Sequence, residues 1–248
     1  MLILKKKYKY TYKIIYKFLV IFIIISCSPS ASKEIIKTSN TVDTETSTTV
    51  KTTESKTYPT LEIKERRTTI PIYDRDDWNH WSDEDGDCQN TRHEVLQDET
   101  QEAVTFTTSS NCYVATGKWY GVYTGEYYYS ASELDVDHFV PLKNAHDSGG
   151  YEWSLKKKKE YANYLEDSDH LIAVQAGANR SKGARGPEDW KPANTEYWCE
   201  YAYDWIRIKD TWGLTVTQDE WNALMLMIST CPDGYVYENA YPKSLLEG

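Results

Sequence analysis

The sequence lacks several features that would assign a class at once. None of its apolar runs reaches the ~20 residues that a membrane-spanning helix needs, which argues against a polytopic membrane protein. None of its five cysteines forms a C-x-x-C pair, which disfavours structural zinc. No repeat, zinc-finger or helix-turn-helix signature is visible. Positive charge is also in deficit, because 28 Lys and Arg face 38 Asp and Glu, and taken alone this argues against nucleic acid as a partner.

The 248 residues that are present divide into two parts. Residues 1–68 hold 13 basic and 6 acidic side chains, whereas residues 69–248 hold 15 basic and 32 acidic ones. All nine Trp lie after residue 77. The hydrophobic fraction of 40% argues against wholesale disorder. We therefore expect one folded domain over 69–248, preceded by a segment of different character.

The first segment has the composition of an export signal followed by a tether. Residues 1–17 carry six lysines and no acid, and Phe18–Ile25 is continuously apolar. Ile24, Ser26 and Cys27 resemble a bacterial lipobox, which implies a signal peptide over 1–26, a lipid on Cys27 and anchoring at the outer membrane or cell surface of the bacterial envelope. An ordinary signal peptide is the alternative. The Ser- and Thr-rich residues 27–68 predict a flexible tether.

The remaining four cysteines are an even number behind an export signal, which predicts two disulfides. We prefer Cys88–Cys112 and Cys199–Cys231 because each pair closes a local loop, although the sequence allows two other pairings.

Local patterns predict an α+β domain with a short antiparallel sheet between helical pieces. Ser154 and Thr217 are expected helix caps, the second with Glu220 at the capping-box position. Lysines 156–159 are expected to face water, and the tyrosine-rich stretch 120–129 is expected to pack. The predicted helices are 91–99, 154–166, 176–183, 195–209 and 218–229, and the predicted strands are 104–107, 112–119, 134–140 and 171–174.

Two stretches carry groups with chemical potential. The first is D-V-D-H-F-V-P over 135–141, and the second is His170 followed later by N-R-S-K-G over 179–183. Carboxylate and amide oxygens suit a hard cation such as Mg²⁺, which keeps open positions for water and phosphate. A neutral imidazole accepts a proton near pH 7. Together these groups suit phosphodiester hydrolysis with one metal.

These strings resemble the two halves of an HNH (His-Me finger) nuclease core, and more closely the secreted bacterial HNH family related to the GmrSD restriction endonuclease C-terminal domain. The resemblance spans about residues 70–231 and implies a ββα-metal core with surrounding helices. Further matching motifs are Asp74-Arg75, Trp78, Trp81, Asp85–Arg92, Glu94–Leu96, Gly117–Trp119, Asp147–Gly149 and Pro187-x-x-Trp190.

The resemblance assigns roles to individual residues. It implies that His138 is the general base and that Asp137 and Asn179 hold one divalent metal, most simply Mg²⁺, with Mn²⁺ as an alternative. His170 stands where many members have an Asn that orients the base. The expected phosphate contacts are Arg92, Arg180 and Lys182. His80, His93 and His146 lack a matching partner and are set aside.

Asp83, Asp85 and Asp87 stand at EF-hand-like spacing with Gln89, Thr91 and Glu94, but the turn glycine is misplaced at Gly86. A structural Ca²⁺ site and a loop braced by its own acids both remain open.

The leading hypothesis is a lipid-anchored, extracytoplasmic endonuclease that acts on DNA, with RNA also open, at low sequence specificity. The alternatives are a non-catalytic surface lipoprotein of the same fold and a periplasmic metal- or sugar-binding module. Nine of the domain's 15 basic groups lie in 143–191, so the basic groups gather near the candidate site despite the acidic total. No protein partner is predicted.

Overall fold

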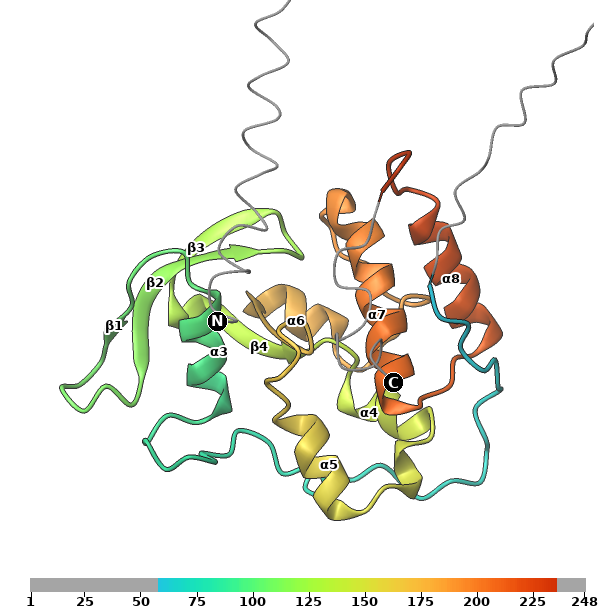
Figure 1. The fold of residues 1–248 in the computed structure, drawn as a ribbon, viewed down its shortest axis with the longest axis horizontal. Coiled ribbons are helices and arrows are strands. Elements are labelled where there is room, and N and C mark those ends of the chain that lie inside the picture. The colour runs from blue at the N-terminus through green and yellow to red at the C-terminus, as the bar shows by residue number, and fades with distance from the viewer. Residues whose placement is uncertain (1–57, 236–248) are drawn as a thin grey trace, which may run out of the picture. The chain divides into compact units, whose positions relative to one another are not determined.

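The computed structural model describes residues 58–235, which belong to one compact unit. The unit is α+β, as predicted, and contains two small antiparallel sheets (Figure 1). The first sheet has the strand order β1-β2-β3, and the second pairs β4 with β5. The strands are β1 (Thr105–Phe106), β2 (Val114–Gly121), β3 (Glu126–Ser130), β4 (Leu134–His138) and β5 (Leu171–Gln175).

Two of the helices begin at the predicted caps Ser154 and Thr217, and α3 begins at a further cap, Asn90. Asn90 accepts a hydrogen bond from the backbone of His93, and Ser154 accepts one from Lys157. Thr217 and Glu220 form the predicted capping box. The α-helices are α3 (Thr91–Glu99), α4 (Leu142–Asp147), α5 (Leu155–Ala162), α6 (Ala176–Lys182), α7 (Trp198–Trp212) and α8 (Gln218–Ile228), and the short 3₁₀ turns are η2 (Ala131–Glu133), η3 (Gly150–Glu152) and η4 (Thr195–Tyr197).

The strand pair β4–β5 and the helix that follows it form the centre of the unit. The pairing is unbroken from Leu134 opposite Gln175 to His138 opposite Leu171. The connection between the two strands contains α4 and α5, whereas β5 leads directly into α6. Helix α6 contacts both strands and lies between β4 and α7 (Figure 1). This arrangement brings β4, which begins at Leu134, against α6, which ends at Lys182.

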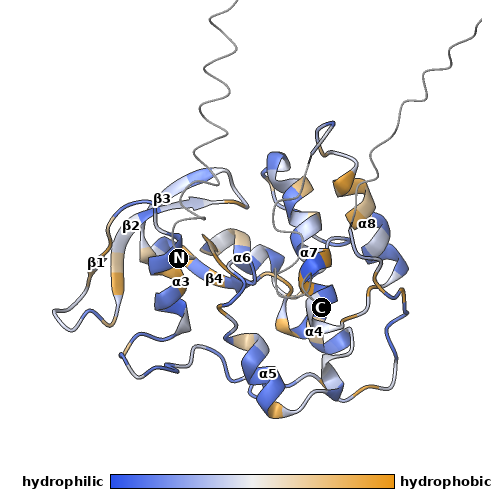
Figure 2. Cartoon of the chain, in the orientation of Figure 1, coloured by the Kyte–Doolittle hydropathy of each residue, from blue (hydrophilic) through white to orange (hydrophobic). Residues whose placement is uncertain are grey.

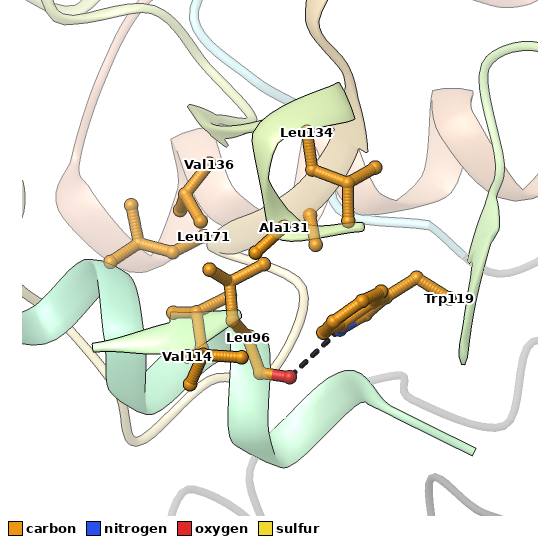
Figure 3. Close-up of a cluster of buried hydrophobic side chains, with 9 residues drawn as sticks. Leu96, Val114, Trp119, Ala131, Leu134, Val136 and Leu171 are labelled. Carbon is orange, nitrogen blue, oxygen red and sulfur yellow. Dashed lines mark hydrogen bonds between the residues drawn. The ribbon is translucent and has the colours of Figure 1, made fainter. Parts of the chain in front are cut away.

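One hydrophobic cluster joins the two sheets through α3. Leu134 and Val136 leave β4 on the same side and meet Leu96 of α3 and Trp119 of β2 (Figure 3). The indole Nε1 of Trp119 donates to the Leu96 carbonyl at 2.8 Å, so its buried polar atom is satisfied. The other buried members are Val95, Val114, Ala131, Leu171 and Ala173. Since Leu134 and Val136 point into this cluster, the alternating residues Asp135 and Asp137 point to the opposite side of β4.

Two disulfides each link segments that lie apart in the sequence. Cys88 bonds to Cys112, and Cys199 at the start of α7 bonds to Cys231 beyond α8. These are the two pairs preferred from the sequence. The second disulfide reinforces the packing of α7 on α8, which also contains a buried ion pair between Lys209 and Glu220 at 2.5 Å.

The predicted start of the domain at residue 69 is too late. Leu61 is buried, and Ile63 forms a parallel bridge with Val216. The ring of Tyr58 packs edge-on against Tyr203 and Trp221. Residues 58–68 are therefore part of the folded unit. Cys27, the predicted signal peptide and the rest of the predicted tether lie outside the described residues.

The lysine-rich helix α5 also departs from expectation. Its colouring in Figure 2 is hydrophilic along most of its length, but Lys158 is buried and bonds to Asp77 at 2.7 Å. Conversely, Leu155 is exposed. Across 58–235 no helix is both long and apolar enough to cross a bilayer.

Candidate functional site

The two adjacent motif residues Asp137 and His138 leave β4 toward different neighbours. The strand has no bulge at this point, so successive side chains alternate in direction. Asp137 faces α6, whereas His138 faces the end of α5 and the loop that precedes α3. The site therefore has two halves, one on each side of β4.

His138 is held in a defined tautomer. Its ring is buried, and Nε2 lies 2.9 Å from the carbonyl oxygen of Ala162. A carbonyl only accepts, so Nε2 carries the proton and Nδ1 carries the lone pair. Burial holds the pKa of His138 well below its usual value, and the Ala162 carbonyl opposes that shift only in part. At neutral pH the side chain is an unprotonated imidazole with one basic nitrogen.

His170 makes the equivalent contact one residue earlier on the same helix. Its Nε2 lies 2.7 Å from the Tyr161 carbonyl, and its backbone carbonyl accepts from the Phe139 amide at 3.0 Å. Burial lowers its pKa to about 4. Its Nδ1 is buried without a hydrogen-bond partner among the described residues. His170 thus contacts both α5 and the end of β4.

The carboxylate of Asp137 is engaged by two buried donors. Lys182 Nζ donates to its Oδ2 at 2.5 Å, and the Tyr123 hydroxyl donates to the same oxygen at 2.8 Å. The Lys182 ammonium also donates to the carbonyls of Phe139 and His138, at 2.8 and 3.2 Å. Burial lowers the pKa of Lys182, and the adjacent carboxylate of Asp137 opposes that shift.

This network changes the role expected for Lys182. Its side chain is fully buried, and its three N–H donors all have protein acceptors. It is therefore not placed to contact a phosphate. For the same reason, Asp137 is paired with a cation instead of standing open to a metal.

The carboxylate that faces Asn179 is Asp135, two residues before Asp137. Asn179 Nδ2 lies 3.3 Å from Asp135 Oδ2, and Arg180 Nε lies 3.5 Å from the same oxygen. The Asp135 side chain is 30% exposed and that of Arg180 is 75% exposed. The predicted pair of Asp137 with Asn179 is thus not the pair of side chains that the structure brings together.

Of the three expected phosphate contacts, Arg180 is the exposed one. Arg92 is half-buried and donates to the carbonyls of Ala131 and Leu134, both at 3.1 Å. Burial lowers the pKa of Arg92. Its contacts fix the turn that leads into β4, so Arg92 braces the strand instead of projecting toward a ligand.

Two residues that sequence reasoning set aside or gave no role lie against His138. The Trp81 indole packs on the imidazole with ring centroids 5.3 Å apart and planes 30° apart. The His80 ring lies 6.2 Å away and nearly perpendicular. The sequence signal for these two residues was the density of aromatic residues in the loop before α3. Aromatic side chains order a loop by packing against other residues.

The acidic loop contains three exposed carboxylates, from Asp83, Asp85 and Asp87, with oxygens within 4.8 Å of one another. These carboxylates already accept backbone hydrogen bonds inside the loop. Asp83 accepts from Gly86 at 2.8 Å and Cys88 at 3.1 Å, and Asp87 accepts from Gln89 at 2.7 Å. These contacts brace the loop, and Ca²⁺ binding by the three clustered carboxylates stays a prediction.

The comparisons with known proteins define the class. The family described as the C-terminal domain of GmrSD restriction endonucleases matches residues 90–227, more than half of the sequence, and the chain belongs to that family. The matched region contains β4, β5 and α6 but begins after Trp81.

A fungal relative also matches the chain. The chain is 39% identical over 159 residues to an uncharacterized secreted protein of the fungus Arthroderma benhamiae. The alignment covers 64% of this chain and 76% of the relative. No solved structure matches.

Proposed function

We propose that the protein is an extracytoplasmic, metal-dependent endonuclease that hydrolyses phosphodiester bonds in DNA, and in RNA as a second substrate class, with little sequence preference. The observation that carries the proposal is the buried, neutral imidazole of His138, with its tautomer fixed, in a family named for restriction endonucleases. The order β4, β5, α6 supports an HNH-type ββα core around it.

His138 would act as the general base. Its Nδ1 takes a proton from the attacking water, while Nε2–H stays bonded to the Ala162 carbonyl. The imidazolium that forms is stabilised by the same carbonyl, so the ring does not need to turn during the step. His170 holds the neighbouring carbonyl of α5 and acts as a positioning residue.

A divalent metal, Mg²⁺ or Mn²⁺, would stabilise the charge that develops on the phosphorus-bound oxygens. Asn179 suits such an ion, because half a turn of its amide presents Oδ1 toward Asp135. Asp137 fits less well because Lys182 already neutralises it. We infer that Asp135 and Asn179 are the open ligand pair. They lie beside the buried Asp137, on the side of β4 opposite to His138. Arg180 would contact the substrate phosphate.

The location outside the cytoplasm is supported by two disulfides and by the secreted relative. We further propose lipid attachment at Cys27. Mass spectrometry of the N-terminal peptide from membrane fractions tests this, and an unmodified Cys27, or cleavage elsewhere, would show that the chain is exported without an anchor.

The central experiment is digestion of plasmid DNA and of RNA by the purified full-length chain, with Mg²⁺, Mn²⁺ or EDTA. We expect cleavage that EDTA abolishes, and a loss of about 10²- to 10⁴-fold in His138→Ala. Thermal melting establishes that the variant is folded. Cleavage that persists in His138→Ala would contradict the mechanism, and no cleavage with any metal would favour a non-catalytic binding protein.

A further inference from the structure

The loop before α3 carries an unusual backbone conformation at Trp81. Its φ is +61°, in the left-handed region that bulky residues rarely adopt. In the described residues only two other non-glycine positions share a positive φ, namely Cys88 and Asn111. Asn is commonly found there, but Trp is not. Such strain persists only where surrounding contacts impose it, and it concentrates at functional sites.

The contacts that impose it come from the end of α5. Asn163, which ends that helix, accepts from the Ser82 amide at 2.9 Å and donates to the Asn79 carbonyl at 2.7 Å. The Asn163 side chain thus binds the backbone on both sides of Trp81. The single hydroxyl proton of Thr91 is shared between two acceptors, Asn163 Oδ1 and the Ser82 carbonyl, each 2.9 Å from Oγ1, and this links Asn163 to α3.

The same helix end holds His138. Ala162, whose carbonyl binds His138 Nε2, directly precedes Asn163. One edge of the imidazole is therefore fixed by the helix, while the indole of Trp81 packs against the ring at a tilt of 30°. The His80 ring packs near both rings, with its centroid 5.4 Å from that of Trp81 and 6.2 Å from that of His138. Its Nδ1 donates to the Trp78 carbonyl at 2.9 Å.

We propose that Trp81 is a positioning residue for His138: it locks the imidazole plane so that Nδ1 points to the attacking water, and the strained loop exists to place the indole there. The inference rests on the proposed function for its effect on catalysis. A hydrogen bond at Nε2 alone leaves the ring free to pivot about that contact. Packing over the ring face removes this freedom, which is how a reactive group is held in attack geometry.

Three substitutions at Trp81 separate the effect of its aromatic ring from the effect of its strained backbone. Trp81→Phe keeps an aromatic face, Trp81→Ala removes it, and Trp81→Gly removes it while accepting the positive φ without strain. We expect kcat for plasmid nicking to fall at least 10-fold in Trp81→Ala and Trp81→Gly with KM within twofold, and to stay within threefold in Trp81→Phe. Trp81→Gly should melt at a higher temperature than Trp81→Ala. Tyr129→Ala, an exposed aromatic on β3, is the matched control and should leave nicking unchanged.

A second measurement does not depend on activity. Nitrogen-15 spectra of histidine-labelled protein report the tautomer and ring environment of His138. We expect one Nε2–H form in the wild type and in Trp81→Phe, and exchange-broadened or mixed signals in Trp81→Ala. An unchanged His138 signal in Trp81→Ala overturns the inference, as does full kcat in that variant. If the wild type itself cleaves nothing but the His138 signal is disturbed in Trp81→Ala, the positioning role stands and the nuclease proposal fails.

Discussion

Asp135 and Asp137 are the same residue type on the same side of one strand, yet they have opposite environments. Asp137 is buried with Lys182 and Tyr123, whereas Asp135 is partly exposed beside Asn179. A buried charge that loses its partner is strongly destabilising, but an exposed one is not. The two positions should therefore respond differently to the same substitution.

Asp137→Asn should lower the free energy of unfolding by about 3 kcal/mol, because it leaves the Lys182 ammonium buried without its counter-charge. Asp135→Asn should change stability little but weaken Mn²⁺ binding about 10-fold or more. Urea unfolding and calorimetric titration measure the two effects. If Asp137→Asn instead lost Mn²⁺ affinity at unchanged stability, Asp137 and not Asp135 would be the metal ligand.

The motif predicted roles for His138 and Asn179, because the chemistry expected of them is tied to residue type. It could not decide between the two aspartates. That choice depends on where the Lys182 ammonium finds three acceptors, and two of these are backbone carbonyls that no motif records. His80 and Trp81 were missed for a similar reason, since their approach to His138 depends on a loop held by Asn163.

At the scale of secondary structure, the end of α5 is a shared support. The last carbonyls of a helix lack partners within it, and here two consecutive ones are bound by His138 and His170. Both imidazoles donate in their neutral form. For His170, protonation would place a second proton on Nδ1, which is buried without a hydrogen-bond partner among the described residues.

The pH dependence of stability follows from this support. The unfolded chain takes up a proton at His170 near pH 6.5, whereas burial holds its folded pKa at about 4, so stability present above pH 6.5 is lost as pH falls toward 4. Between pH 7 and pH 5 this amounts to about 2 kcal/mol for His170. Urea unfolding at both values should show a smaller loss in His170→Asn than in the wild type. Equal losses in both proteins would contradict the assignment.

Most elements were predictable because their signals are local. Caps such as Asn90, Ser154 and Thr217 act within three residues, and the strands of the hairpin follow from alternation. The burial of Lys158 was not predictable, because its partner Asp77 lies 81 residues earlier in the sequence. The same holds for Tyr58 and Leu61, which are isolated apolar residues in a charged stretch without periodicity.

At the scale of the whole molecule, that stretch closes the described unit by pairing its first residues with the turn before α8. The Lys64 amide donates to the Val216 carbonyl at 2.7 Å, and the Val216 amide donates to the Glu62 carbonyl at 3.0 Å. A domain cut at residue 69 loses both bonds and the buried Leu61 side chain.

A chain that begins at residue 69 should therefore be less stable than one that begins at residue 56, by about 2–3 kcal/mol, from the lost burial of Leu61 and the two hydrogen bonds. Parallel thermal melts of the two truncated chains measure the difference. Identical melting temperatures would mean that residues 58–68 add nothing to the fold.

The Cys88–Cys112 disulfide joins the acidic loop to the region before β2, just beyond the segment that carries Trp81. This disulfide restricts the unfolded chain, and thereby stabilises the folded one, only after the two thiols have been oxidised. In the reducing interior of a cell the thiols stay apart, and we expect this segment to be less ordered there. Under the proposed function, export would then also be a maturation step, because the chain would reach full nuclease activity only outside the compartment that holds the cell's own DNA.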